Sequence, residues 1–204
     1  MTRQNLLRAA FIALLMATAS VTAKDSYQMH CAHCHGTAGQ GSDAIGAPNL
    51  TLLSTAYIRR QLEGFKEGWR ENEDSRTKTM TMAISTLDAS VLASATSAIN
   101  SFPDTKRKTD VAHDGNKGRG KDLYNAYCSA CQGTNAVGND ALGAPNLLGF
   151  SHAYLSRQYR HFVEGRRGHH PDDRYGQQMA RLTRALKDPQ LIDDVSTYVA
   201  SLAE

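Results

Sequence analysis

An internal repeat constrains the fold of this 204-residue chain more than any other feature. Shifted by 97 positions, residues 24–70 align with residues 121–167 and are identical at 24 of 47 positions. The stretch 46–50, Gly-Ala-Pro-Asn-Leu, returns unchanged as 143–147. A period this long lies well above the 20–50 residues of solenoid repeats, so it indicates a duplicated domain. Each copy has about 80 residues, which is small for a hydrophobic core that must be stable without support.

Each copy contains two cysteines separated by two residues, and in the first copy a histidine follows directly. Residues 31–35 read Cys-Ala-His-Cys-His, the attachment signature of c-type haem. The two thiols bond to the haem vinyl groups, and the adjacent histidine binds the iron. A zinc site is the alternative, but zinc motifs usually separate their ligand pairs along the chain. We therefore predict haem c on Cys31 and Cys34, with His35 as its proximal ligand.

The second copy departs from this motif at the ligand position. Cys128 and Cys131 are followed by Gln132, and an amide binds iron less well than an imidazole. Three outcomes are open. Haem is attached to both cysteines with a weak, absent or substitute ligand; or the cysteines carry no haem and can form a disulfide; or Gln132 is a coding variant. His152 and His161 are expected on the surface rather than at the iron.

A haem that only transfers electrons needs a sixth ligand, and methionine is the usual one. The second copy offers Met179, whereas the first offers both Met80 and Met82. Met179 lies seven residues before Leu186, as Met80 lies seven before Leu87. This register predicts Met80 and Met179 as the two iron ligands and makes Met82 a core residue.

The proline of the repeated loop follows its CxxC motif by the same interval in both copies, at Pro48 and Pro145. A carbonyl in this loop can accept a hydrogen bond from the far nitrogen of the proximal histidine and so orient the ring. A turn proline that sets φ is the structural alternative, and the two roles are compatible.

Residues 1–23 have the features of a cleavable secretory signal. Arg3 and Arg8 supply a basic start, residues 9–16 are apolar but too few to span a bilayer, and residues 21–23 form a small-residue cleavage site. An uncleaved membrane anchor is the alternative. Processing changes the formal net charge from 23 − 20 = +3 to 21 − 20 = +1, which does not favour a nucleic-acid partner. Export predicts a periplasmic protein.

Apolar spacing predicts helices in both copies, and no segment alternates as a strand does, so the predicted fold class is all-α. Helices are expected near residues 57–65 and 91–102 and at their counterparts in the second copy, and another leads into the second CxxC motif. Pro, Gly and charged residues favour an exposed linker between the copies. The predicted division is a signal peptide at 1–23, domain 1 at 24–102, a linker at 103–118 and domain 2 at 119–204.

The whole mature chain resembles the dihaem cytochromes c of the cytochrome c4 type, which are tandem class I cytochrome c domains. The resemblance rests on the two CxxC motifs, the Gly-Ala-Pro-Asn-Leu loops, the Tyr-x-x-x-Gln helices and the late methionines. The second copy is also similar to cytochrome c domains fused to some terminal oxidases. The resemblance implies a periplasmic electron carrier rather than an enzyme. Its redox partners would be a dehydrogenase and a terminal oxidase or reductase, and it can associate peripherally with the membrane.

Two other functions stay open on the sequence. One is a cytochrome subunit of a larger dehydrogenase, for instance of the sulfide-oxidising flavocytochrome kind. The other is a haem protein that binds ligands or reacts with peroxide through an open second haem. Gln132 is the feature that favours this last function, and His169 and His170 are the candidates for an acid or base near that haem.

Overall fold

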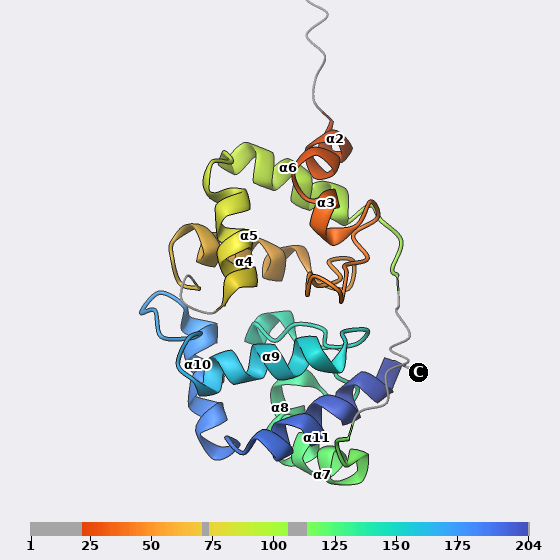
Figure 1. The fold of residues 1–204 in the computed structure, drawn as a ribbon, viewed down its shortest axis with the longest axis vertical. Helices are drawn as coiled ribbons and strands as arrows, with labels where there is room; N and C mark the ends of the chain where they lie inside the picture. Colours follow the sequence, from red (N-terminus) through yellow and green to blue (C-terminus); the bar gives the residue numbers. More distant parts are fainter. Residues whose placement is uncertain (1–21, 71–73, 106–113, 204) are drawn as a thin grey trace, which may run out of the picture.

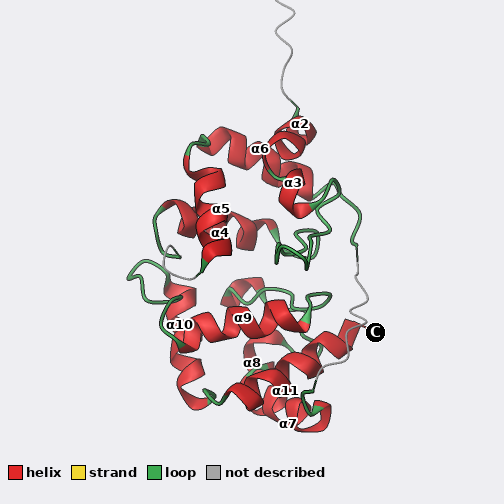
Figure 2. Ribbon diagram, viewed as in Figure 1, coloured by secondary structure: helices red, strands yellow, loops and turns green. Residues whose placement is uncertain are grey.

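The computed structural model describes residues 22–70, 74–105 and 114–203. Figures 1 and 2 show that these residues form helices joined by loops, arranged as two stacked lobes that correspond to the two copies. In the described residues there is no β-strand, and extended pairing is limited to the isolated bridges Ser42–Ala47 and Asn139–Ala144. The predicted all-α class is therefore confirmed. The predicted signal peptide lies outside the described residues, except for Thr22 and Ala23.

The helices of the first domain have counterparts in the same order in the second. The first domain contains α2 (Ala23–His30), α3 (Ala32–His35), α4 (Thr55–Lys66), α5 (Ser75–Ser85) and α6 (Ala89–Ile99). The second contains α7 (Lys117–Tyr127), α8 (Ser129–Gln132), η1 (Asp140–Leu142), α9 (His152–Val163), α10 (Arg174–Leu182), η2 (Thr183–Ala185), α11 (Pro189–Ala200) and η3 (Ser201–Ala203). The helices predicted from apolar spacing correspond to α4, α6, α7, α9 and α11.

The first and last helices of each domain pack against each other, α2 against α6 and α7 against α11. A fully buried tyrosine lies on the first helix of each pair, Tyr27 in one domain and Tyr124 in the other. Its hydroxyl donates a hydrogen bond to the glycine carbonyl that follows the CxxC motif, at 2.7 Å to Gly36 and 2.6 Å to Gly133. This bond ties the helix pair to the CxxC turn, so the repeat preserves the support of the motif as well as the motif itself.

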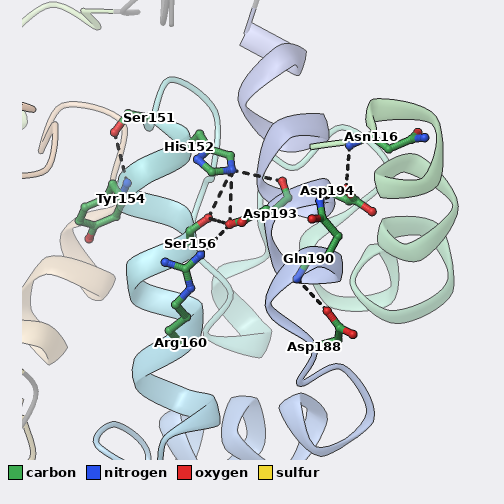
Figure 3. Close-up of polar contacts among 10 residues, drawn as sticks. All are labelled: Asn116, Ser151, His152, Tyr154, Ser156, Arg160, Asp188, Gln190, Asp193 and Asp194. Carbon is green, nitrogen blue, oxygen red and sulfur yellow. Dashed lines mark hydrogen bonds and ion pairs between the residues drawn. The ribbon is translucent and has the colours of Figure 1, made fainter. Parts of the chain in front are cut away.

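Two neighbouring carboxylates fix α11 in the second domain (Figure 3). Asp194 is fully buried and accepts hydrogen bonds from the Asn116 backbone N–H at 2.7 Å and from the Arg119 guanidinium on α7. Asp193 accepts from Ser156 and Arg160 on α9. The pair therefore joins the first, middle and last helices of the domain.

Asp194→Asn is expected to lower the free energy of unfolding by about 2 kcal/mol at neutral pH, because a buried charge-assisted hydrogen bond is weakened. Burial tends to raise the pKa of Asp194, but the hydrogen bonds from Arg119, Asn116 and Gln190 hold it below its usual value. A lowered pKa in the folded state means that this stabilisation is present above about pH 4 and is lost as the pH falls through the folded-state pKa. Urea unfolding at several pH values measures the loss. The exposed Asp122→Asn is the control, and an equal loss at pH 3 and pH 7 would attribute the effect to packing.

Contacts at both ends of the predicted linker, residues 103–118, belong to the neighbouring domains. The Thr105 carbonyl accepts a hydrogen bond from Asn49, which ties this residue to the first domain. At the other end Asn116 caps α7, which begins at Lys117 rather than after residue 118. Side-chain hydrogen bonds at helix starts and loops are not visible in a composition pattern. The basic run 106–108 lies outside the described residues.

The two domains meet through a set of contacts that repeats the internal duplication. Arg60 on α4 donates to the Gly143 carbonyl at 2.8 Å, and Arg157 on α9 donates to the Gly46 carbonyl at 2.9 Å. Each arginine therefore binds the other domain's copy of one loop. Equivalent residues exchange equivalent bonds, as at a two-fold symmetric dimer interface.

A buried arginine–glutamine cluster lies at the same interface. Arg167 donates to Gln158 of its own domain and to Gln61 of the first domain, both at 2.7 Å. Arg70 donates in the same way to Gln61 at 2.9 Å and Gln158 at 3.1 Å. Both arginines are 7% exposed. Bidentate guanidinium contacts of this kind fix orientation, so they hold the two domains in one relative position.

Membrane-spanning capacity is limited among the described residues. No single helix there is long and apolar enough to cross a bilayer. Only α5 and α6 taken together have the length and composition of a membrane span, and the pair is bent by 115°.

Candidate functional site

The first CxxC motif forms one helical turn, α3, that continues from α2. Gly36 ends it with a φ of 79°, a left-handed conformation that glycine adopts without a steric cost. His35 is 7% exposed, and its Nδ1 lies 3.0 Å from the Pro48 carbonyl. Because a carbonyl only accepts, Nδ1 carries the proton and Nε2 keeps a free lone pair. The expected orienting carbonyl of the repeated loop is thus confirmed, and the imidazole is held in the tautomer that binds a metal through Nε2.

Burial also sets the protonation of the groups around this motif. Burial lowers the pKa of His35, against the opposite effect of its bond to Pro48, so the ring is kept in the neutral, ligating form. Burial raises the pKa of the Cys31 thiol to about 11 and that of Cys128 to about 12.

The predicted methionine ligands occupy equivalent positions on capped helices. Asp74 caps α5 by accepting from the Thr77 backbone N–H at 2.8 Å, and Met80 lies six residues later. Asp173 caps α10 through the Gly176 backbone N–H, and Met179 lies six residues after that cap. This register favours Met80 as the counterpart of Met179.

Met80 is half-buried, whereas Met82 is 74% exposed. The prediction that Met82 is a core residue is therefore wrong, because two further residues along α5 turn its side chain to the outer face of the helix.

The second CxxC motif has the same backbone but a different terminal side chain. α8 ends at Gln132, and Gly133 repeats the left-handed turn with a φ of 73°. The Gln132 Oε1 atom is buried and has no hydrogen-bond partner among the residues that the structure describes. The second domain thus keeps the turn that presents a ligand, but the side chain on it is an amide with an unsatisfied oxygen.

A cavity of about 210 Å³ lies directly against this motif. Cys128, Cys131 and Gln132 form one part of its wall, and Met179 and the Pro145 loop form others. Much of the remaining lining is apolar, and α9 and α11 supply part of it. An apolar cavity of this size next to two thiols fits a bulky, covalently attached group better than a closed protein core.

The residues present fit haem c in both domains. In the first, the two thiols, an oriented neutral imidazole and a half-buried methionine are the residue types that would hold a c-type haem. In the second, two thiols and Met179 line one cavity, and only the imidazole is missing. When bound, the group supplies one-electron oxidation and reduction at its iron. These residues would hold and orient it.

Two expectations about other histidines are wrong. His161 is 5% exposed rather than on the surface, because its Nε2 lies 3.4 Å from Asp74 Oδ2 of the first domain. His152 is also largely covered, with a side chain 14% exposed beside Asp193. His169 and His170 do not line the second cavity; His170 instead stacks on Trp69 of the first domain, with ring centroids 5.7 Å apart. None of these contacts places a histidine at the second cavity.

First-domain residues that line the second cavity were missed by sequence reasoning. They are Leu53, Tyr57, Arg60 and Gln61. The repeat held a signal for three of them, since Tyr57, Arg60 and Gln61 are identical in the second copy. Identity shows that a position matters in both copies, but only the assembled structure shows that it faces the other domain.

Comparisons with known proteins agree with this geometry. Residues 20–93 match the family model described as cytochrome c. The thiosulfate dehydrogenase electron acceptor of Stutzerimonas stutzeri (strain A1501) is 29% identical over 184 residues, covering 86% of this chain and 80% of the relative. Cytochrome c4 of Stutzerimonas stutzeri is 28% identical over 181 residues, covering 84% of each.

The structure of cytochrome c4 from Acidithiobacillus ferrooxidans matches 85% of this chain and 99% of its own, with a TM-score of 0.68 at 22% identity. This likeness confirms the predicted tandem arrangement of cytochrome c domains, and the family match identifies the cofactor as haem c. Residues 20–93 therefore match a cytochrome c domain, and the described residues have the two-domain fold of the cytochromes c4.

Proposed function

We propose that this chain is a periplasmic carrier of single electrons, with Cys31 and Cys34 holding the haem of the first domain. The observation that carries the proposal is the His35–Pro48 contact, which presents a neutral imidazole with Nε2 free. With Met80 on the opposite side, both axial positions would be filled by protein atoms. A closed iron exchanges electrons without binding substrate, and the methionine thioether favours its reduced state.

The proposal makes the first domain an electron carrier rather than an enzyme. The bond from His35 to Pro48 would hold the imidazole in one orientation, so little reorganisation would accompany each change of charge at the iron. Cytochrome c4 and an electron acceptor of thiosulfate dehydrogenase are among the relatives. We therefore propose a periplasmic dehydrogenase as electron donor and a terminal oxidase or reductase as acceptor, with peripheral association at the membrane.

A cytochrome subunit of a dehydrogenase complex is a second candidate, and the relative named as an electron acceptor of thiosulfate dehydrogenase favours it. A free carrier would leave its donor after each electron, whereas a subunit would stay bound. Size-exclusion chromatography of the protein in its native periplasmic extract separates these cases, because only a subunit would elute with a flavoprotein or another dehydrogenase.

The proposed function is tested on the protein purified from periplasm. Intact mass is expected to show a chain beginning near Lys24 with covalent haem. The reduced protein should be reoxidised by respiratory membranes in a reaction blocked by cyanide, and a redox titration should be reversible with one electron per haem. An N-terminus at Met1 with membrane retention would contradict export. A haem that membranes neither reduce nor oxidise would contradict the carrier function.

A further inference from the structure

The second cavity contains polar atoms that the fold leaves without partners. Four buried side-chain oxygens lack a hydrogen bond in the described residues, and two of them, Gln132 Oε1 and the Tyr159 hydroxyl, belong to residues that line this cavity. A buried polar atom without a partner costs about 1–3 kcal/mol. Two such atoms in residues of one cavity wall point to a bound molecule as their partner.

The repeat shows that both atoms arise from substitutions at matched positions. Where Gln132 stands the first domain has His35, and where Tyr159 stands it has Leu62. Leu62 packs into an apolar cluster with Cys31, and Tyr159 packs beside Cys128 in the equivalent cluster. The second domain has therefore replaced an imidazole and an aliphatic side chain by a carbonyl and a hydroxyl at the same cavity.

We infer that the second domain is a ligand-binding haem site, in which Cys128 and Cys131 hold the ring and the axial position vacated by imidazole admits a small uncharged molecule such as carbon monoxide. The amide of Gln132 is too weak a ligand to close that position. Tyr159 supplies a hydrogen-bond donor to the bound molecule, whereas the Gln132 carbonyl accepts only from a ligand that carries a hydrogen, which carbon monoxide does not.

The surroundings favour small, neutral ligands. Burial raises the pKa of Tyr159, so its hydroxyl stays protonated and able to donate. The cavity wall is mostly apolar, and the Gln132 oxygen repels anions. Tyr127 and Leu142, which also line the cavity, are 39% and 40% exposed, so the cavity reaches the surface and a small molecule can enter.

The test uses the full-length processed protein. Intact mass counts the covalent haems, and the spectrum of the dithionite-reduced protein is followed during titration with carbon monoxide. We expect two haems, of which one binds carbon monoxide and the other, in the first domain, does not. A single covalent haem, or two haems that are both inert to carbon monoxide, would overturn the inference. The electron-carrier proposal would stand in either case, because it concerns the other domain.

A matched pair of substitutions tests the role assigned to Tyr159. Tyr159→Phe removes the donor and is expected to speed carbon monoxide dissociation about fivefold, as for the loss of one hydrogen bond. Thr197→Val removes another buried, unpartnered hydroxyl that does not line the cavity, so the rate should stay unchanged. Equal rates in the wild-type protein and both variants would overturn the part assigned to Tyr159.

Discussion

Replacing Met80 by alanine is expected to abolish the methionine-to-ferric-iron charge-transfer absorption of the first domain and to open its haem to carbon monoxide. Alanine has no donor atom, so the iron would keep only His35 and lose the thioether that favours its reduced state. The reduction potential of this haem should fall for the same reason. The ferric absorption spectrum, a carbon monoxide titration and a redox titration measure the three effects.

Met82→Ala is the matched control, because Met82 lies on the same helix but is 74% exposed. We expect it to leave the absorption band, the potential and the inertness to carbon monoxide unchanged. The opposite pattern would make Met82 the ligand and would show that the two copies are offset by two residues between Asp74 and Met80. Both substitutions leave the Asp74 cap of α5 in place. If both variants lost stability equally, the loss would reflect damage to the helix rather than loss of an iron ligand.

The parts of the fold that could be predicted from sequence are those that depend on neighbouring residues along the chain and that occur in both copies. Apolar spacing correctly predicted α4 and α9, and one interval between the CxxC motif and Pro48 correctly predicted the bond to His35. The helices that carry the methionines, α5 and α10, were not predicted as helices. Their starts depend on the Asp74 and Asp173 caps, and α5 combines threonines with apolar residues in no clear helical stripe.

The features that escaped prediction depend on the meeting of the two domains. His161 has Gly64 as its counterpart, so the repeat held no information about its role. Its burial follows from Asp74 on the other domain, and no periodicity within α9 can reveal that contact. The same limit applies to Gln61, whose place between two arginines of different domains appears only when both domains are assembled.

The contact between His161 and Asp74 connects the second domain to the helix that carries Met80, the proposed iron ligand of the first domain. Burial tends to raise the pKa of Asp74, but its bonds to Thr77 and the nearby His161 and Arg157 hold it below the usual value. The carboxylate thus stays ionised, caps α5 and faces α9 of the second domain at the same time. The start of the helix that carries Met80 is therefore set by both domains, which gives the second domain a structural role even apart from its own haem.

Gln132→His is expected to convert the second haem from an open, high-spin site to a closed, low-spin one. The introduced imidazole would lie on α8, the counterpart of the one-turn helix α3 that carries His35, and beside the Pro145 loop, which matches the Pro48 loop of the first domain. Imidazole is the stronger axial ligand, and together with the Met179 thioether it would fill both positions. The absorption and paramagnetic resonance spectra should change from one low-spin haem to two, and carbon monoxide binding should be lost.

Gln132→His both adds an iron ligand and removes the unpartnered Gln132 oxygen, whereas Gln132→Leu only removes that oxygen, so it separates the two effects. Leucine cannot bind iron, so the second haem should stay high-spin and continue to bind carbon monoxide. Removing the buried, unsatisfied Oε1 atom should also raise the free energy of unfolding by about 1 kcal/mol. If the wild-type protein already has two low-spin haems, and neither substitution changes them, another residue must perform in the second domain the role that His35 performs in the first.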